Sequence, residues 1–148
     1  MKPKIAVILG QTAVGKTEIS VSVAESVGAE IVSADSVALY RDMEIGTAKP
    51  DAGIKRRVPH HLIDIVTLGE HYSAVHYAAA ADRIIENIRK RGRIPLVVGG
   101  TPLYLRSLLT GLLPGVGENH NLRRVLDRKS NEELMSELRT IDPVSADT

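Results

Sequence analysis

The sequence predicts an α/β fold in which a parallel β-sheet is flanked by helices on both faces. Short apolar runs alternate with segments of helical periodicity, and this alternation is typical of βα units. The first apolar run, residues 5–9, leads directly into the glycine-rich sequence GQTAVGKT at residues 10–17. The length of 148 residues, with 43% hydrophobic and 25% charged residues, is that of one globular domain.

The glycine-rich sequence fits the pattern GxxxxGK[ST] of a phosphate-binding loop, or P-loop, between a buried strand and a helix. It comprises Gly10, Gln11, Thr12, Ala13, Val14, Gly15, Lys16 and Thr17. Backbone N–H groups of such a loop converge on an anion at the helix N-terminus. Lys16 supplies a mobile positive charge, and the Thr17 hydroxyl is placed to reach a Mg²⁺ ion that bridges phosphates. The predicted fold is therefore P-loop NTPase-like, and the motif leaves open which phosphate compound is bound.

The helix after the P-loop is predicted from Ile19, Val23 and Val27, which recur at helical spacing and should form its buried side. Gly28 is placed to end this helix with a left-handed cap. The chain has no Phe or Trp and only four Tyr, so the side chains that fill the core should be mainly aliphatic.

The next strand ends close to an acidic residue. Apolar residues 31–32 lead to Asp35, which places a carboxylate just beyond the carboxyl end of a buried strand. Ligands of open α/β sheets bind at that edge. Residues 41–61 mix charged residues with Gly and Pro, and we expect them to cross the surface as a long excursion. A short strand is predicted at residues 62–65.

Two helices and a strand should follow. Ser73 can cap a helix that ends at Gly92 and has the apolar stripe Val75, Ala78, Ala81, Ile85 and Ile88. Residues 94–98 predict a third buried strand, which opens on Gly99, Gly100 and Thr101. Thr101 can cap a helix that begins at Pro102 and ends at Gly111. Its expected buried side is Leu105, Leu108, Leu109 and Leu112.

The remaining sequence has a different character. A linker rich in Gly and Asn begins at residue 114, and Ser130 with Glu133 forms a predicted capping box for a last helix. The chain has no cysteine, which excludes disulfides, and no apolar stretch near the roughly 18 residues of a membrane span. The apolar run after the N-terminus is too short for a signal peptide, so a cytoplasmic protein is expected.

Four segments together point to a family. They are Asp35-Ser36 with Tyr40, IGTAKP at residues 45–50, VPHHLID at residues 58–64 and VVGGTPLYL at residues 97–105. From residue 4 to about 113 the chain resembles tRNA dimethylallyltransferases. The resemblance implies transfer of a dimethylallyl group from dimethylallyl diphosphate to N6 of adenine 37 in tRNA, beside the anticodon.

The resemblance assigns roles to the candidate residues. The P-loop, with Mg²⁺, would hold the diphosphate of the prenyl donor, where Lys16 stabilises the charge of the leaving group. Asp35 would act as the base for the weakly basic adenine amine. Thr101 would face the centre where adenine and diphosphate meet, although a helix cap is its ordinary role. These implied catalytic residues are Asp35, Lys16 and Thr101.

The implied acceptor is the tRNA anticodon stem-loop. Asp35, Ser36, Val37 and Ala38 correspond to the segment that contacts the flipped-out adenine, with Ala38 in place of a glutamine common in relatives. Arg123 lies where the family places a phosphate contact to tRNA. Adjacent His60 and His61 are expected to have structural roles, because neighbouring histidines rarely bind one metal ion together.

The resemblance also bears on domain organisation. Residues 1–113 correspond to the N-terminal part of a P-loop α/β catalytic core, and residues 114–148 to the start of a helical tRNA-binding insertion. Family members run to about twice this length, so the chain is expected to be truncated within the insertion, and the resemblance leaves open whether these 148 residues are active alone. A monomer without membrane contact is expected.

Three alternatives remain open. A small P-loop kinase would have this size, but neither IGTAKP nor GGTPLY belongs to the kinase pattern. A GTPase-like switch would need the NKxD guanine motif, which the sequence lacks. An adenylate isopentenyltransferase would use the same donor with a free adenosine phosphate as the acceptor.

Overall fold

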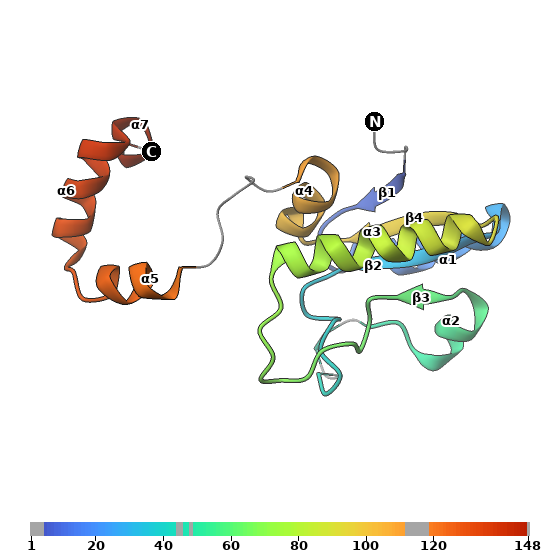
Figure 1. The fold of residues 1–148 in the computed structure, drawn as a ribbon. Helices are drawn as coiled ribbons and strands as arrows, with labels where there is room; N and C mark the ends of the chain where they lie inside the picture. Colours follow the sequence, from blue (N-terminus) through green and yellow to red (C-terminus); the bar gives the residue numbers. More distant parts are fainter. Residues whose placement is uncertain (1–4, 44–45, 48, 112–118, 148) are drawn as a thin grey trace. The chain divides into compact units, whose positions relative to one another are not determined.

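A computed structural model of the chain describes residues 5–43, 46–47, 49–111 and 119–147. The chain divides into two compact units, Met1–Leu112 and Leu113–Thr148, and each is considered by itself. The first unit contains β1 (Ala6–Leu9), α1 (Lys16–Val27), β2 (Ala29–Ala34), α2 (Ala52–Arg57), β3 (His60–His61), α3 (Ala74–Lys90), β4 (Ile94–Gly99) and α4 (Pro102–Thr110) (Figure 1). The second contains α5 (His120–Leu126), α6 (Asn131–Ile141) and α7 (Pro143–Ala146).

The strands of the first unit form a parallel sheet in the order β1-β4-β2-β3, which confirms the predicted fold class. Three of these strands end level with one another, because Gly99 is the register partner of both Leu9 and Ala34. The segments that follow β1, β2 and β4 therefore leave the sheet at one edge. These segments are the P-loop, the turn at Asp35 and the turn before α4.

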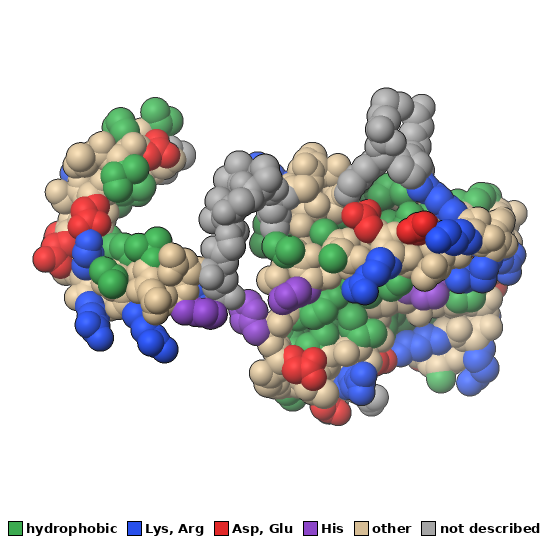
Figure 2. Space-filling view, viewed as in Figure 1, with side chains coloured by type: hydrophobic (Ala, Val, Ile, Leu, Met, Phe, Trp, Pro, Cys, Tyr) green, Lys and Arg blue, Asp and Glu red, His purple; other side chains and the backbone are tan. Residues whose placement is uncertain are grey.

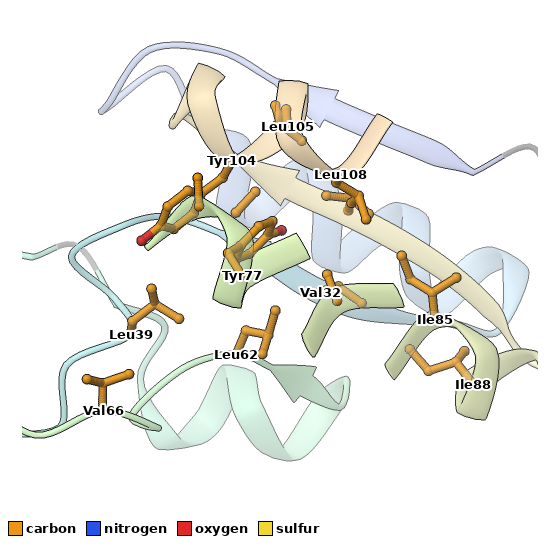
Figure 3. Close-up of a cluster of buried hydrophobic side chains, with 14 residues drawn as sticks. Val32, Leu39, Leu62, Val66, Tyr77, Ile85, Ile88, Tyr104, Leu105 and Leu108 are labelled. Atoms are coloured by element: carbon orange, nitrogen blue, oxygen red, sulfur yellow. The ribbon is translucent and has the colours of Figure 1, made fainter. Parts of the chain in front are cut away.

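The helices cover both faces of the sheet, as the alternation of side chains along its strands shows. Val32 of β2 and Val97 of β4 pack in one cluster with α3 and α4 (Figure 3). Ile31 and Leu96, one residue earlier in each strand, pack in a second cluster with α1. Successive strand residues point to opposite faces, so the central strands are buried from both sides.

The first strand differs from its prediction. β1 lies at the edge of the sheet, and Leu9 at its end is 59% exposed, so it is not the buried strand that its apolar sequence indicated. An apolar run has the same appearance in an edge strand as in a central one.

The predicted buried side of α1 was wrong. Ile19, Val23 and Val27 are 56%, 38% and 49% exposed, whereas the buried residues are Ser20, Val21 and Ala24. The P-loop decides where this helix begins and therefore which side faces the sheet. Burial of Ser20 is tolerated because its hydroxyl donates a hydrogen bond to the Thr17 carbonyl at 2.9 Å. The left-handed end at Gly28, with φ of 67°, is confirmed.

The predictions for α3 and α4 were partly right. Ser73 caps α3 as expected, but Val75 is exposed and Tyr77 is fully buried in its place. In α4, Leu109 is exposed while Tyr104 and Ser107 are buried. The ring of Tyr77 stacks on that of Tyr104, so the two helices meet through aromatic and small side chains. The predicted apolar stripes contain five of the other buried residues, Ala81, Ile85, Ile88, Leu105 and Leu108, but not buried Ala74 at the start of α3.

The surface excursion is more ordered than the sequence indicated. Asp51 caps α2 by accepting a hydrogen bond from the Ile54 N–H at 2.8 Å. The short strand is β3 at His60–His61, and the strand predicted at residues 62–65 is absent from this described segment. Leu62 and Asp64 have φ values of 59° and 57°, and such left-handed residues interrupt an extended strand.

The second unit contains short helices with exposed surfaces, on which charged and hydrophobic side chains are mixed (Figure 2). The predicted capping box of α6 is confirmed, because the Glu133 N–H and Ser130 side chain bond each other, as do the Ser130 N–H and Glu133 carboxylate. None of the described residues of α5, α6 or α7 is buried. The predicted linker from residue 114, and Leu112 before it, lie outside the described residues. In the parts of the chain that the structure covers, each helix is too short or too polar to cross a membrane.

Candidate active site at the carboxyl edge of the sheet

A cavity of about 460 Å³ lies at the edge where β2 and β4 end. Its P-loop side is formed by Thr12, Ala13, Gly15, Lys16 and Thr17, and its opposite wall includes Asp35, Val37 and Ala38. Eight of the residues that the sequence singled out thus line one cavity. Gly10, Gln11, Val14, Ser36 and Thr101 lie next to these residues without lining it.

The P-loop has the backbone geometry of an anion-binding turn. Ala13 and Gly15 have positive φ values of 66° and 84°, and Gly15 is the N-cap residue of α1. No described side chain caps α1, so the first N–H groups of this helix are left for a ligand. The Lys16 ammonium group donates a hydrogen bond to the Gln11 carbonyl, which holds the side chain across the loop. The arrangement suits binding of a phosphate or diphosphate group.

Asp35 is held in place through one of its two carboxylate oxygens. Oδ1 accepts hydrogen bonds from the N–H groups of Val37 at 2.8 Å and Ala38 at 3.1 Å. The described residues make no hydrogen bond to Oδ2. The carboxylate is therefore oriented by the backbone turn that follows β2, while its second oxygen is available to a molecule in the cavity.

Thr101 joins the ends of β2 and β4. Its hydroxyl accepts a hydrogen bond from the Ser36 N–H at 3.0 Å and donates one to Ser36 Oγ at 3.3 Å. Thr101 occupies the N-cap position of α4, as predicted, but its side chain makes no capping hydrogen bond. The hydroxyl is instead used to position the turn that carries Asp35.

Gly99 is required by the close approach of the same two strands. A Cβ atom at this position would lie 2.2 Å from the carbonyl oxygen of Ala34, which is far inside contact distance. At Gly100 a Cβ atom would lie 3.1 Å from the Gly10 carbonyl oxygen. The two glycines therefore allow β2, β4 and the P-loop to converge at the cavity.

A network of charged residues supports the outer wall of the cavity, which is the part lined by Pro50, His60 and Ile63. The Asp64 carboxylate accepts hydrogen bonds from Lys49 at 2.6 Å and Lys55 at 2.7 Å, and Lys49 also bonds the Tyr40 carbonyl. Burial by itself raises the pKa of Asp64. The two ammonium groups nevertheless bring this pKa below its usual value. The network ties the segment after β2 to the segment after β3. The sequence analysis noted the motifs IGTAKP, which contains Lys49, and VPHHLID, which contains Asp64. It had no signal that these two residues form an ion pair.

The two adjacent histidines have separate partners. His60 lines the cavity, and its Nδ1 lies 2.7 Å from the Val58 carbonyl oxygen, while burial lowers its pKa. His61 Nε2 lies 2.7 Å from Glu30 Oε2, which also accepts a hydrogen bond from Arg91 at 2.6 Å. The described residues contain no group of three or more His, Asp or Glu side chains arranged to hold a metal ion.

Arg123 is the only predicted site residue in the second unit. It lies on α5 and is exposed, and its carbonyl accepts a hydrogen bond from the Asp127 N–H at 2.8 Å. Its assignment as a tRNA contact stays a prediction.

A P-loop and an acidic residue that share one cavity at the carboxyl edge of a parallel sheet define a P-loop α/β protein, and the geometry of the cavity suits a phosphorylated ligand. The model of the IPP transferase family matches residues 38–148, and the chain belongs to this family. The match covers the outer wall of the cavity, β4, α4 and the whole second unit.

The relatives carry more specific names. A tRNA dimethylallyltransferase of Thermotoga petrophila is 47% identical over 146 residues, which are 97% of this chain and 48% of that protein. One from Thermomicrobium roseum is 49% identical over 150 residues, 98% of this chain and 45% of that protein. The chain therefore spans about half the length of the curated relatives that it matches.

Solved structures agree with the fold. The tRNA isopentenylpyrophosphate transferase of Bacillus halodurans has a TM-score of 0.74 and 39% identity, over 98% of this chain and 50% of that protein. A eukaryotic dimethylallyltransferase described as acting on tRNA has a TM-score of 0.83 and 30% identity, over 98% of this chain and 37% of that protein.

Proposed function

We propose that this chain serves in the transfer of a dimethylallyl group from dimethylallyl diphosphate to N6 of adenine 37 in tRNA. One observation carries the proposal: the P-loop residues Lys16 and Thr17 and the carboxylate of Asp35 line the same cavity. The first two suit a diphosphate, and the third suits proton removal from an amine. The names of the relatives support this choice of donor and acceptor.

The donor is proposed to bind with its diphosphate in the P-loop. As the bond between the allylic carbon and the diphosphate oxygen breaks, negative charge grows on the leaving group. Lys16 and the uncapped N–H groups at the start of α1 stabilise that charge. This stabilisation is electrostatic and involves no covalent bond to the protein. A loop of the kind that serves nucleotide hydrolysis in other proteins can therefore serve prenyl transfer here.

A Mg²⁺ ion fits the oxygen donors at this position. Thr17 lines the cavity beside Lys16 and carries a hydroxyl oxygen, and Mg²⁺ is commonly held by one or two protein oxygens with phosphate oxygens and waters. Bound there, the ion would stabilise the negative charge of the diphosphate. Thr17 is proposed as its protein ligand.

Asp35 is proposed as the base that completes the transfer. The adenine N6 attacks the allylic carbon and gives up a proton, which Asp35 Oδ2 is free to accept. Hydrogen bonds from Val37 and Ala38 to Oδ1 keep the carboxylate oriented. Thr101 holds this turn through Ser36, and a direct contact of its hydroxyl with the reacting groups is part of the proposal.

The two parts of the chain are proposed to have different tasks. Residues 1–113 would form the catalytic core, and residues 114–148 would begin a helical insertion in which Arg123 contacts tRNA phosphate. The division into compact units between Leu112 and Leu113 supports this assignment. Exposed arginines on a short helix are suited to phosphate contact.

Binding and transfer assays with competing ligands test the proposal. The chain, with Mg²⁺, should bind dimethylallyl diphosphate in calorimetry more tightly than ATP. Diphosphate release should depend on an anticodon stem-loop with adenosine at the target position, and AMP should not replace it. Transfer of the γ-phosphate of ATP to an acceptor would establish a kinase instead. Equal use of AMP would establish an adenylate isopentenyltransferase.

A further inference from the structure

The four tyrosines of the chain lie in one hydrophobic cluster, although they are far apart in the sequence. Tyr77 and Tyr104 are buried in it, and Tyr40 and Tyr72 pack against it partly exposed. With no Phe or Trp in the chain, this cluster holds all of its aromatic residues of the Phe, Tyr and Trp type. It occupies the face of the sheet covered by α3 and α4, opposite to the face covered by α1.

Two of these tyrosines form a stack whose hydroxyl groups have different surroundings. The rings of Tyr77 and Tyr104 lie 4.3 Å apart with an interplanar angle of 11°. In Figure 3 the Tyr77 hydroxyl points into the cluster, whereas the Tyr104 hydroxyl points out of it in the opposite direction. The Tyr77 hydroxyl is enclosed and has no hydrogen-bond partner among the residues that the structure describes.

The Tyr104 hydroxyl is a rigidly held donor without a partner among the described residues. The residue is only 6% exposed, so stacking and burial fix its ring. Burial, with Tyr40, Tyr72 and Asp35 nearby, raises the pKa of Tyr104, so its hydroxyl keeps its proton at neutral pH. A fixed donor that the protein leaves unused is suited to a ligand.

Two successive hydrogen bonds through Thr101 connect Tyr104 to the neighbour of Asp35. The Tyr104 N–H donates to the Thr101 carbonyl at 3.1 Å, and the Thr101 hydroxyl bonds Ser36, the neighbour of Asp35. The P-loop approaches Asp35 through the cavity on the α1 side, because Ile31 and Ser33 of β2 line that cavity. Asp35 is thus flanked by the P-loop on one side and by the start of α4 on the other.

Displacement chemistry decides which side the acceptor uses. A nucleophile that displaces diphosphate from a carbon approaches that carbon from the side opposite to the leaving oxygen. If the diphosphate occupies the P-loop, as the proposed function requires, the acceptor base approaches from the side remote from Lys16. Tyr104 belongs to the cluster on the α3 and α4 face of the sheet, whereas the P-loop leads into α1 on the opposite face.

We propose that the Tyr104 hydroxyl donates a hydrogen bond to N1 or N7 of the acceptor adenine and so orients its N6 toward Asp35. This inference rests on the proposed function. It assigns Tyr104 as a contact for the acceptor base and leaves the donor diphosphate to the P-loop. A Tyr104→Phe change removes the hydroxyl and keeps the ring stack.

Fluorescence anisotropy with three stem-loop RNAs tests the inference, with adenosine, 1-deazaadenosine or 7-deazaadenosine at the target position. Wild-type protein should bind one deaza loop roughly threefold to tenfold more weakly than the adenosine loop, the range for one neutral hydrogen bond. Tyr104→Phe should bind the adenosine loop more weakly by a similar factor and should no longer distinguish that deaza loop. Its affinity for dimethylallyl diphosphate should be unchanged.

Tyr77→Phe is the matched control, because it removes the other hydroxyl of the same stack and should leave all three affinities unchanged. The inference is overturned if Tyr104→Phe binds adenosine RNA as the wild type does, or if it still distinguishes the deaza loops. If Tyr104→Phe failed to fold, equal affinity of the wild type for all three loops would overturn it. A fourth stem-loop, with an abasic target position, separates failure of this inference from failure of the proposed function. If the wild type bound the adenosine and abasic loops equally, the proposed acceptor would be overturned as well.

Discussion

The Thr101 hydroxyl bonds Ser36 across 65 positions of sequence, accepting from its N–H at 3.0 Å and donating to its Oγ at 3.3 Å. This pair connects the turn after β4 to the turn after β2. Because Asp35 precedes Ser36, the position of its carboxylate depends on a residue from the other strand. The candidate site is thus coupled to the register of the sheet.

Removal of this hydroxyl should loosen the turn. Thr101→Val keeps the shape of the side chain but leaves the Ser36 N–H without its acceptor, which should lower the free energy of unfolding by about 1–2 kcal/mol. Urea denaturation measures the change. Thr101→Ser keeps the hydroxyl and should lose less. Equal losses for the two variants would show that the methyl group, and not the hydroxyl, supports the turn.

Two substitutions in the cavity should separate donor binding from transfer. Lys16→Ala removes the charge next to the diphosphate and should weaken binding of dimethylallyl diphosphate at least about tenfold. Asp35→Ala should leave donor binding intact, since its proposed partner is the acceptor amine. Calorimetry measures the binding, and diphosphate release with a stem-loop RNA measures the transfer. Transfer by Asp35→Ala at most of the wild-type rate would contradict its assignment as the base.

Gly99→Ala should be strongly destabilising. Its Cβ atom would lie 2.2 Å from the Ala34 carbonyl oxygen, and neither strand can move without disturbing the sheet. We expect a loss of at least about 2 kcal/mol in the free energy of unfolding. Gly69→Ala is the matched control, because a Cβ atom at Gly69 would have no atom of the described residues within 4 Å. Similar stability of the two variants would mean that the strands separate more easily than their register indicates.

Tyr77→Phe should leave the protein as stable as the wild type or make it more stable. The Tyr77 hydroxyl is buried without a partner in the described parts of the chain, so its removal eliminates an uncompensated desolvation of about 1 kcal/mol or more. Thermal denaturation followed by circular dichroism measures the effect. A clear loss of stability would indicate that the hydroxyl has a partner in solution, such as a buried water molecule.

Glu30 should make stability depend on pH in the acid range. Burial by itself raises its pKa, but hydrogen bonds from His61 and Arg91 bring that pKa below the usual value. A carboxylate with a lowered pKa stabilises the fold above its unfolded-state pKa, near 4.3, and this contribution is lost as the pH falls through the folded-state pKa. Urea midpoints between about pH 3 and 7 should therefore fall more steeply for the wild type than for Glu30→Gln. Parallel curves would contradict the role of Glu30.

Local signals predicted part of the fold, and the failures have identifiable causes. The caps at Ser73 and Ser130 and the end at Gly28 were predictable because capping depends on residues within one helical turn. The buried side of α1 was not, since apolar spacing places Ile19 inside whereas the P-loop and the sheet turn that side outward. Tyr77 was missed for a similar reason, because its burial depends on the partner ring of Tyr104.

The sequence by itself determined the kind of site: its motifs identified the P-loop from Gly10 to Thr17 and singled out Asp35 and Thr101. A phosphate-binding loop can be recognised from sequence because its backbone conformation depends on residues that are contiguous. Only the tertiary structure decided that Thr101 holds the turn of Asp35, that Lys49 and Lys55 pair with Asp64, and that Tyr104 stacks on Tyr77. These contacts join segments that are distant in the chain, and their geometry is determined by strand register and helix packing.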